Sequence, residues 1–312
     1  MILSKIHCYT KMPKVSVIIP NYNHSSFLRQ RIESVLNQTC QDFEVILLDD
    51  KSTDDSTDVI TSYRDHPKVA QIIINEDNSG STFKQWERGI NASSADLIWI
   101  AESDDWCEPS LLQELVLPFD IDPNCTISYC QSHCILESNV IAWSSSHTLL
   151  SENIAGQDFI KKYMLKNNTV FNASMVVWKK ETYSKISRNY LNYRFCGDWL
   201  FWIEFALQGN VHISGKTLNY FRKHAKDVSS TAYGTGLFLL ENLTLLNSLL
   251  NAKIISKHDY NTAFKFHYRN YWLAYTNIDE RYKSKIESLY RNPLTGKKLY
   301  YKNFFKAMYK YI

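Results

Sequence analysis

Residues 97–106 read LIWIAESDDW, and this stretch decides what fold and chemistry the rest of the chain can support. Its apolar first half has the length of a strand, and a continuous apolar run is typical of a strand buried on both faces. Three carboxylates, Glu102, Asp104 and Asp105, follow at once. They would repel one another unless a cation lay among them, and Mg²⁺ or Mn²⁺ takes such oxygen ligands, usually shared with substrate phosphates. The alternative is a solvated turn in which Asp105 is the N-cap of a helix starting at Trp106.

The sequence before this stretch alternates between strand and helix patterns. Apolar runs predict four strands, at 14–20, 43–48, 69–74 and 97–101. Helical patterns lie between them, beginning at Ser25 or Ser26, at Ser56 or Thr57, and at Thr82. Such alternation predicts a doubly wound α/β fold with a mostly parallel sheet. Ligands of these sheets bind beyond the carboxyl ends of the strands, so the polar clusters 20–23, 49–50 and 102–105 should meet in one crevice.

After residue 110 the alternation weakens. We expect further strands at 127–134, 140–143, 173–178, 212–213 and 217–222. We expect helices at 156–165, from Thr182, and at 198–208, 237–250 and 259–276. The last two indicate a C-terminal helical extension. We therefore divide the chain into a domain of residues 13–230 and an extension of residues 231–312.

Composition excludes several classes of protein. The chain has 312 residues and a net charge of +3, which is too small to indicate nucleic-acid binding. No apolar run approaches the roughly 18 residues of a membrane-spanning helix, and residues 1–12 lack the long apolar core of a signal peptide. The seven cysteines are scattered and odd in number, as expected for reduced thiols. We therefore expect a cytoplasmic protein.

The segment from Arg281 onward is basic and aromatic, with Glu287 as its one acid. Lysines interleaved with Tyr and Phe suit an anionic membrane surface, which would make the protein peripheral at the inner face of a membrane. The alternative is an ordinary last helix that packs its aromatic side chains on the domain. We do not expect a nucleic-acid partner.

The ordered series of motifs resembles the family 2 glycosyltransferases, which have the GT-A fold. It begins with VSVIIPNYN at 15–23 and continues with SVLNQT at 34–39 and FEVILLDDKSTD at 43–54. NED at 75–77, GI at 89–90 and IWIAESDD at 98–105 complete the series. The family usually has Gly where Lys51 stands and Asp where Glu102 stands. The resemblance covers roughly residues 13–109, with weaker similarity to about residue 230.

The resemblance implies a nucleotide site at the first two strand ends. The residues that match the loop bordering the nucleotide base are Pro20, Asn21 and Tyr22. Asp50 matches the acid that accepts a hydrogen bond from the base, and Asp49 lies beside it. Turn chemistry is the alternative for both acids, above all for Asp49. The helix after residue 81 departs from the family's usual sequence, and Lys84 or Arg88 could contact phosphate there.

The resemblance also implies a divalent cation, Mn²⁺ or Mg²⁺. Asp104 and Asp105 match the metal and ribose end of the family's DXD-type motif, with Glu102 at its leading position. A longer carboxylate at Glu102 could bind directly or through water. His224 lies in a segment that resembles the part of the family reaching the diphosphate, as a metal ligand or a phosphate donor. Arg222 or Lys223 could add charge, and a solvated basic loop is the alternative.

Asp198 precedes an apolar helix, as an acid does in this family. The resemblance implies that Asp198 is the general base that removes a proton from the acceptor hydroxyl. Its position also suits the N-cap of that helix.

Together these features predict an inverting, metal-dependent glycosyltransferase. It would move a sugar from a nucleoside diphosphate-sugar donor to a glycan or lipid-linked acceptor, in bacterial surface polysaccharide or lipopolysaccharide assembly. One alternative is a module of the same fold that binds nucleotide-sugar without turnover. Another is a nucleotidyltransferase, which usually has a glycine-rich basic loop after the first strand, where this chain reads NYNHSS at 21–26.

Overall fold

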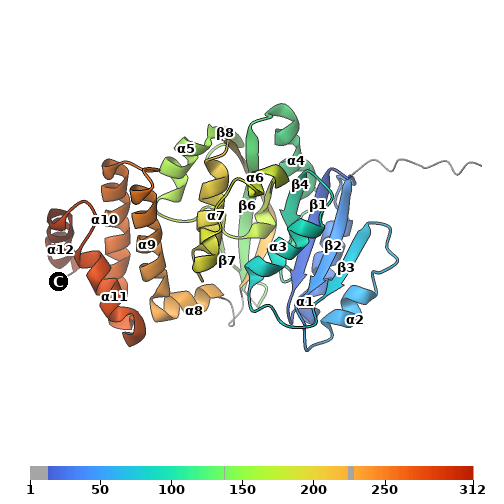
Figure 1. The fold of residues 1–312 in the computed structure, drawn as a ribbon, viewed down its shortest axis with the longest axis horizontal. Helices are drawn as coiled ribbons and strands as arrows, with labels where there is room; N and C mark the ends of the chain where they lie inside the picture. The colour runs from blue at the N-terminus through green and yellow to red at the C-terminus, as the bar shows by residue number, and fades with distance from the viewer. Residues whose placement is uncertain (1–12, 137, 224–227, 312) are drawn as a thin grey trace, which may run out of the picture.

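A computed structural model describes residues 13–136, 138–223 and 228–311. They form a mixed sheet with helices packed against it, and a group of helices at the end farthest from the N-terminal strands (Figure 1). The strand order is β3-β2-β1-β4-β9-β6-β10-β5, with β7 paired to β6 and β8 paired to β10. The predicted α/β fold with C-terminal helices is therefore confirmed.

The N-terminal half of the sheet is parallel. Its strands are β1 (Val15–Asn21), β2 (Phe43–Asp49), β3 (Val69–Ile74) and β4 (Leu97–Ile100). They are connected by α1 (Ser25–Leu36), α2 (Ser56–Thr61) and α3 (Thr82–Ala92). Every residue of β1 and β4 is buried, which explains why both strands are apolar apart from Ser16 and Asn21 of β1. Because Asn21 pairs with Asp49 and Ile18 with Ile100, the polar residues after these strands leave the sheet at the same edge.

The second half of the sheet contains antiparallel pairs. Its strands are β5 (Trp106–Cys107), β6 (Cys125–Leu136), β7 (Ile141–Ser144), β8 (Ser151–Ala155), β9 (Val176–Lys179) and β10 (Asn210–Lys223). The prediction of two strands at 212–213 and 217–222 is wrong, because β10 is one strand whose register shifts between Ile213 and Thr217. The polar break is accommodated inside the sheet, where the buried Ser214 hydroxyl donates to Glu114 over 2.8 Å.

Several local predictions also need correction. The helix predicted at 156–165 is α5 (Gly156–Phe159) followed by a π-helix, η1 (Ile160–Met164), and the strand predicted at 173–178 begins as a 3₁₀ turn, η2 (Ala173–Met175). The other short elements here are α6 (Lys180–Tyr183), η3 (Asn189–Asn192) and α7 (Gly197–Ala206). Asp105 does not cap a helix, because β5 follows it and α4 (Leu111–Ile121) has Ser110 as its N-cap.

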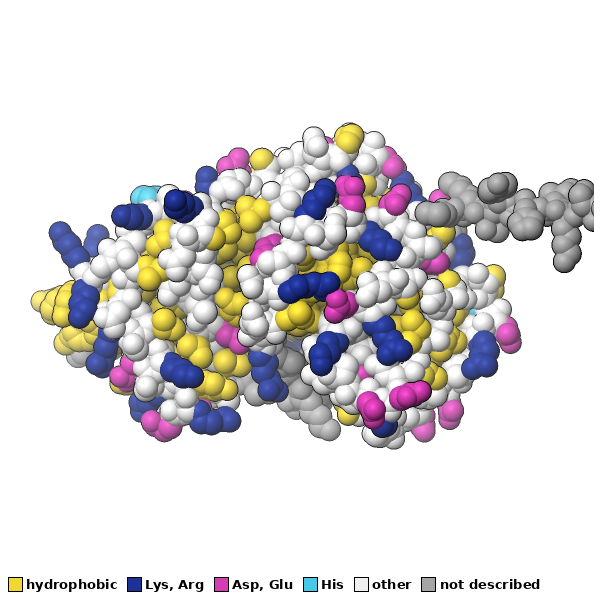
Figure 2. Space-filling view, viewed as in Figure 1, with side chains coloured by type: hydrophobic (Ala, Val, Ile, Leu, Met, Phe, Trp, Pro, Cys, Tyr) yellow, Lys and Arg dark blue, Asp and Glu magenta, His cyan; other side chains and the backbone are white. Residues whose placement is uncertain are grey.

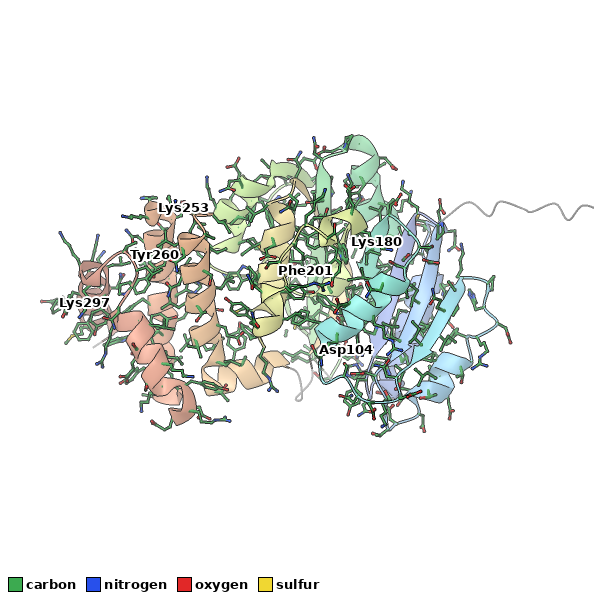
Figure 3. The ribbon with its side chains drawn as sticks, viewed as in Figure 1. Asp104, Lys180, Phe201, Lys253, Tyr260 and Lys297 are labelled. Atoms are coloured by element: carbon green, nitrogen blue, oxygen red, sulfur yellow. The ribbon has the colours of Figure 1, made fainter. Side chains whose placement is uncertain are left out.

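Five α-helices follow β10. They are α8 (Val228–Thr235), α9 (Leu237–Asn251), α10 (Lys257–Ala274), α11 (Glu280–Arg291) and α12 (Lys297–Tyr311), with the 3₁₀ turn η4 (Tyr275–Asn277) after α10. One hydrophobic core runs from the sheet through Phe201 of α7 to Tyr260 of α10, both labelled in Figure 3. In the described part of the chain, no helix is both long and apolar enough to cross a membrane.

Candidate active site at the carboxyl ends of the strands

Asp49 stabilises the turn that follows β2. Its fully buried carboxylate accepts hydrogen bonds from the Asn21 side chain (2.9 Å) and from the amide and hydroxyl of Ser52 (2.8 and 2.6 Å). Lys51, inside this turn, has a φ of 60°, in the left-handed region that favours glycine. The interactions of Asp49 are thus those of turn chemistry.

Asp50 is held by the loop between β3 and α3. Its Oδ1 accepts hydrogen bonds from Asn75 (2.6 Å), the Ser79 amide (2.8 Å) and Gln85 (2.8 Å), and its Oδ2 accepts one from the Ser79 hydroxyl (2.8 Å). The residue is 4% exposed. Oδ2 therefore keeps acceptor capacity that Oδ1 has used.

The other residues predicted near the nucleotide lie at the end of β1 and at the start of α3. Pro20 is buried in β1, whereas the Tyr22 side chain is 46% exposed beyond the strand end. Lys84 is exposed at the start of α3, and its Nζ donates to the Ser79 carbonyl over 3.1 Å. Lys84 thus belongs to α3 and contacts the loop that binds Asp50.

The three acids after β4 form what we call the acid turn, residues 102–105. Glu102 accepts a hydrogen bond from the Trp86 indole over 2.8 Å, and burial together with the charge of Asp104 raises the pKa of Glu102 to about 8. Burial and the same charge raise the pKa of Asp105 well above its usual range. The acids therefore repel one another, as carboxylates sharing one site do.

Asp105 faces the interior of the protein. It is 1% exposed, and it accepts hydrogen bonds from the Asn172 side chain on Oδ2 (2.5 Å) and from the Arg222 amide on Oδ1 (3.0 Å). These contacts join the acid turn to the end of β10 and to the segment before η2. Asp105 is consequently less available to a metal than the resemblance implied.

The donor atoms fit a divalent cation in an open site. In the described ranges, no three His, Cys, Asp or Glu side chains converge as a closed metal site would require. Mg²⁺, however, is commonly held by one or two carboxylates plus substrate phosphates. Glu102 and Asp104 supply oxygen atoms whose mutual repulsion a cation would relieve. His224 lies outside the described residues.

Two arginines hold the acid turn in place. The fully buried Arg31 donates from Nε to the Glu102 carbonyl over 2.9 Å. Arg222 donates from Nε to the Asp104 carbonyl over 2.9 Å, and its guanidinium lies between the rings of Phe27 and Trp106, 4.4 and 4.5 Å from their centroids. The Arg222 guanidinium is buried in these contacts, and its charge acts on Asp104 and Asp105. Arg31 was missed, although it shares the helical face of Leu28 and Ile32.

Asp198 lies in the first turn of α7, at the wall of a cavity of about 430 Å³. The helix N-cap is Cys196, so the N-cap prediction for Asp198 is wrong. Its Oδ1 accepts from the Trp199 amide over 2.7 Å and its Oδ2 from Asn168 over 3.0 Å. Burial is the main cause that raises the pKa of Asp198 to about 7. A carboxylate of this kind can exchange a proton near neutral pH.

The cavity is lined by aromatic and polar side chains from several elements. They include Trp143, Phe171, Phe221, Lys223, Tyr233 and Asn242. Neighbouring residues of β10 contact the cavity and the acid turn in alternation. Phe221 and Lys223 line the cavity, whereas the backbone amide of Arg222, between them, binds Asp105 of the acid turn. Likewise, Phe171 lines the cavity and its neighbour Asn172 binds Asp105. The cavity and the acid turn are therefore linked by neighbouring residues of β10 and of the segment at 171–172.

Helix α3 connects the remaining parts. Gln85 binds Asp50 and its neighbour Trp86 binds Glu102, so the first two acidic clusters share one helix. Phe83 of the same helix packs on Gly197, where an added Cβ would lie 2.6 Å from the ring. Figure 3 shows Asp104 between the parallel strands and α7. The polar clusters at the strand ends are thus linked through α3 and through the Asn21–Asp49 hydrogen bond, and that they open onto one crevice stays a prediction.

Comparisons with known proteins agree on one family. A family model described as glycosyl transferase family 2 matches residues 16–186. An uncharacterized glycosyltransferase of Nostoc sp. is 37% identical over 108 residues, which are 34% of this chain and 33% of that protein. Poly(ribitol-phosphate) beta-N-acetylglucosaminyltransferase TarP of Staphylococcus aureus is 35% identical over 108 residues, covering 33% of this chain and 32% of TarP.

A solved structure extends the similarity beyond the matched motifs. The crystal structure of S. aureus TarS 1–349 in complex with UDP-GlcNAc superposes with a TM-score of 0.66 at 17% identity, covering 88% of this chain and 79% of that one. At this identity the likeness concerns the fold. The first curated relatives are matched over about a third to a half of their own length.

Proposed function

The chain belongs to glycosyl transferase family 2, and from this we propose that it transfers a sugar from a nucleoside diphosphate-sugar to an acceptor hydroxyl, with inversion at the anomeric carbon. The observation that carries the proposal is that Asp105 of the acid turn binds Asn172 and the Arg222 amide, which are the chain neighbours of Phe171, Phe221 and Lys223 in the wall of the Asp198 cavity. Glycosyl transfer needs a place to neutralise a departing diphosphate and, beside it, a group that accepts a proton.

Asp198 is the proposed general base. Its pKa of about 7 leaves it largely ionised above neutral pH, so it can accept the proton of an acceptor hydroxyl bound in the cavity. The hydrogen bonds from Trp199 and Asn168 orient its two oxygens. Lys223 lines the same cavity and adds positive charge there. A single displacement requires no covalent intermediate, and inversion follows from it.

The donor would lie along the strand ends. The exposed ring of Tyr22 and Oδ2 of Asp50 would meet the nucleotide base, beside Pro20 and Asn21. Lys84 would meet the phosphates near the start of α3. Asp104 and Glu102 would hold Mn²⁺ or Mg²⁺. When bound, the ion supplies Lewis-acid neutralisation of the diphosphate, an effect of several kcal/mol in other enzymes.

The acceptor and the setting are also proposals. We infer a glycan or lipid-linked acceptor in bacterial surface polysaccharide or lipopolysaccharide assembly, in keeping with the family and with the substrate in TarP's name. We retain residues 13–230 as the transferase domain and residues 231–312 as an extension. Tyr233 of α8 and Asn242 of α9 nevertheless line the cavity, so the extension completes the proposed acceptor site.

Helix α12 is the proposed membrane-contacting surface. Its inner aromatic side chains pack on the protein, as Phe304 does against Trp272. Its outer face exposes Tyr301, Phe305 and Met308, and Tyr309 is 92% exposed. The helix carries lysines and no acidic residue in its sequence. Figure 2 shows hydrophobic side chains gathered at this end of the molecule among Lys and Arg. An anionic lipid surface fits this combination.

Vesicle sedimentation tests this surface. We expect Lys302→Glu with Lys306→Glu to abolish sedimentation with anionic phosphatidylglycerol vesicles. The same charge change at the exposed Lys253 and Lys257, which lie outside α12, is the matched control. Equal sedimentation of both double variants and the wild type would contradict the assignment.

The transfer proposal is tested by donor turnover. UDP-, GDP- and dTDP-sugars are incubated with Mn²⁺ and a panel of glycan and lipid-linked acceptors, and nucleoside diphosphate release and product are measured. We expect turnover with one donor and its loss on chelation. Turnover that resists chelators would remove the metal from the proposal. Nucleotide binding without turnover would favour a binding module, and pyrophosphate release from a sugar phosphate and a nucleoside triphosphate would favour a nucleotidyltransferase.

A further inference from the structure

A carboxylate of the C-terminal helices binds the backbone directly before Asp198. Glu241 of α9 is 9% exposed. Its Oε1 accepts a hydrogen bond from the Arg194 amide (2.9 Å), and its Oε2 accepts from the amides of Phe195 (2.7 Å) and Cys196 (2.8 Å). Three consecutive N–H groups are thus satisfied by one side chain located more than forty residues later in the chain.

Neighbouring contacts secure the same loop. The Cys196 thiol donates to the Asn242 side chain over 3.0 Å, and the Phe195 ring meets the Tyr233 ring with their centroids 5.5 Å apart. Asn242 and Tyr233 also line the cavity that Asp198 borders. The loop at 194–196 leads into α7, and Asp198 is only two residues beyond it. The position of Asp198 therefore depends on α8 and α9.

We propose that Glu241 is a positioning residue for the proposed base, fixing the loop at 194–196 so that the Asp198 carboxylate is held at the cavity wall. The inference rests on the proposed function, because it takes Asp198 to be the group that accepts the acceptor proton. Hydrogen bonds from N–H groups to a carboxylate are stronger than neutral ones, so one side chain can hold the whole loop. A displacement of about 1 Å at a reacting group can cost about 100-fold in rate.

Because Glu241 is charged, its replacement should change the pKa of Asp198, whereas loss of an uncharged packing contact with the loop would not. Burial is the main cause of the raised pKa of Asp198, hydrogen bonds oppose it, and the negative charge of Glu241 adds a smaller upward contribution. Among the residues that the structure describes, the other titratable groups lining the cavity are Cys134 of β6, Cys196, Lys223 of β10 and Tyr233 of α8. Replacing Glu241 with a neutral residue leaves these groups in place. It should therefore lower the pKa of Asp198.

The experiment compares Glu241→Gln with a matched control, Glu204→Gln. Glu204 also accepts from a backbone amide and a hydroxyl, both of Ser187, and lies on the same helix as Asp198. We expect Glu241→Gln to reduce kcat by about 10- to 100-fold and to move the acidic limb of its pH profile to lower pH. Glu241→Asp, which keeps the charge, should restore the limb. Glu204→Gln should leave both quantities near wild type.

A second measurement keeps the outcome independent of turnover. The carboxyl ¹³C signal of Asp198, assigned by its loss in Asp198→Asn, is titrated in the intact wild type and in Glu241→Gln. A lower midpoint in Glu241→Gln supports the proposal even if no donor is turned over, in which case the proposed function alone fails. An unchanged midpoint with unchanged kcat would overturn the positioning role, as would equal losses in the Glu241 and Glu204 variants. If Glu241→Gln does not fold, Glu241→Asp is assayed instead, and a wild-type kcat despite its shorter reach would overturn the role.

Discussion

Asp50 and Asp198 are the same type of residue, yet their surroundings differ in the number of donors. Asp50 accepts four hydrogen bonds from the loop and helix that follow β3. Asp198 accepts two and borders a cavity. A carboxylate surrounded by donors is held in one orientation, whereas a buried carboxylate with few donors titrates closer to neutral pH. The surroundings of Asp50 suit a carboxylate that fixes a loop, and those of Asp198 suit a carboxylate that transfers a proton.

The largest effect should come from removing the carboxylate at the cavity. We expect Asp198→Asn to lower the rate of transfer by about 10² to 10⁴-fold, because a positioned general base contributes roughly that factor. Donor binding, measured by calorimetry, should remain. If Asp198→Asn turned over at the wild-type rate, Asp198 would have no role in proton transfer, and its contrast with Asp50 would be wrong.

The pH dependence of stability sharpens the same contrast. The pKa of Asp198 is about 7 in the folded protein, above the value of about 3.9 in an unfolded chain. The folded state therefore binds the extra proton, and the stability linked to it is present below about pH 4 and lost as pH rises through 7. Between pH 5 and 8 the wild type should lose on the order of a few kcal/mol relative to Asp198→Asn. Urea unfolding of both proteins measures this difference, and parallel curves would contradict it.

A smaller effect is expected at the other carboxylate. Asp50→Asn removes the charge and one acceptor from a site with four donors, so the free energy of unfolding should fall by about 2 kcal/mol. The matched control is Asp77→Asn, whose exposed carboxylate pairs with Lys51 on the surface and should change little. Equal stability of the two variants in urea would show that the donors around Asp50 contribute little.

The smallest effect is expected in the turn that connects Asp50 to α2 and contains Lys51. Lys51→Gly should stabilise the protein by about 0.5 kcal/mol, because Gly adopts a φ of 60° without the strain of a side chain. Asn23→Gly is the contrasting variant. Asn23 also has a positive φ, of 56°, but its side chain accepts a hydrogen bond from the Thr53 amide, so its loss should destabilise. Thermal unfolding that shows no difference between the two variants would contradict this reading of the turn.

The sequence predicted the parallel half of the sheet and the position of its polar ends at one edge. β1, β2 and β4 are predominantly apolar, and parallel strands bring their carboxyl ends to one edge. β10 was divided in error, because the buried Ser214 and its polar neighbours read as a break between strands. A hydrogen bond such as the one from Ser214 to Glu114 spans a hundred residues and leaves no local pattern.

Long-range partners of the site were the residues that sequence reasoning missed. Arg31 and Glu241 are charged residues within the apolar faces of their helices, at the spacing of buried Leu28 and Val35 in one and Leu237 and Leu245 in the other. A charged residue on an apolar helix face indicates a buried group that pairs with it or forms a hydrogen bond to it. It does not say which partner, because the loop at 194–196 and the Glu102 carbonyl are brought to them only by the folded chain.

The hydrogen bonds from the loop before α7 to Glu241 limit which parts of this chain can be exchanged with those of a relative, in evolution or in engineering. A chimera that joined residues 13–230 to the helices of a relative would inherit every recognisable motif and would still leave three amides without their acceptor. The smallest portion that can be exchanged as a working whole therefore extends through Asn242, past the point where the motifs end.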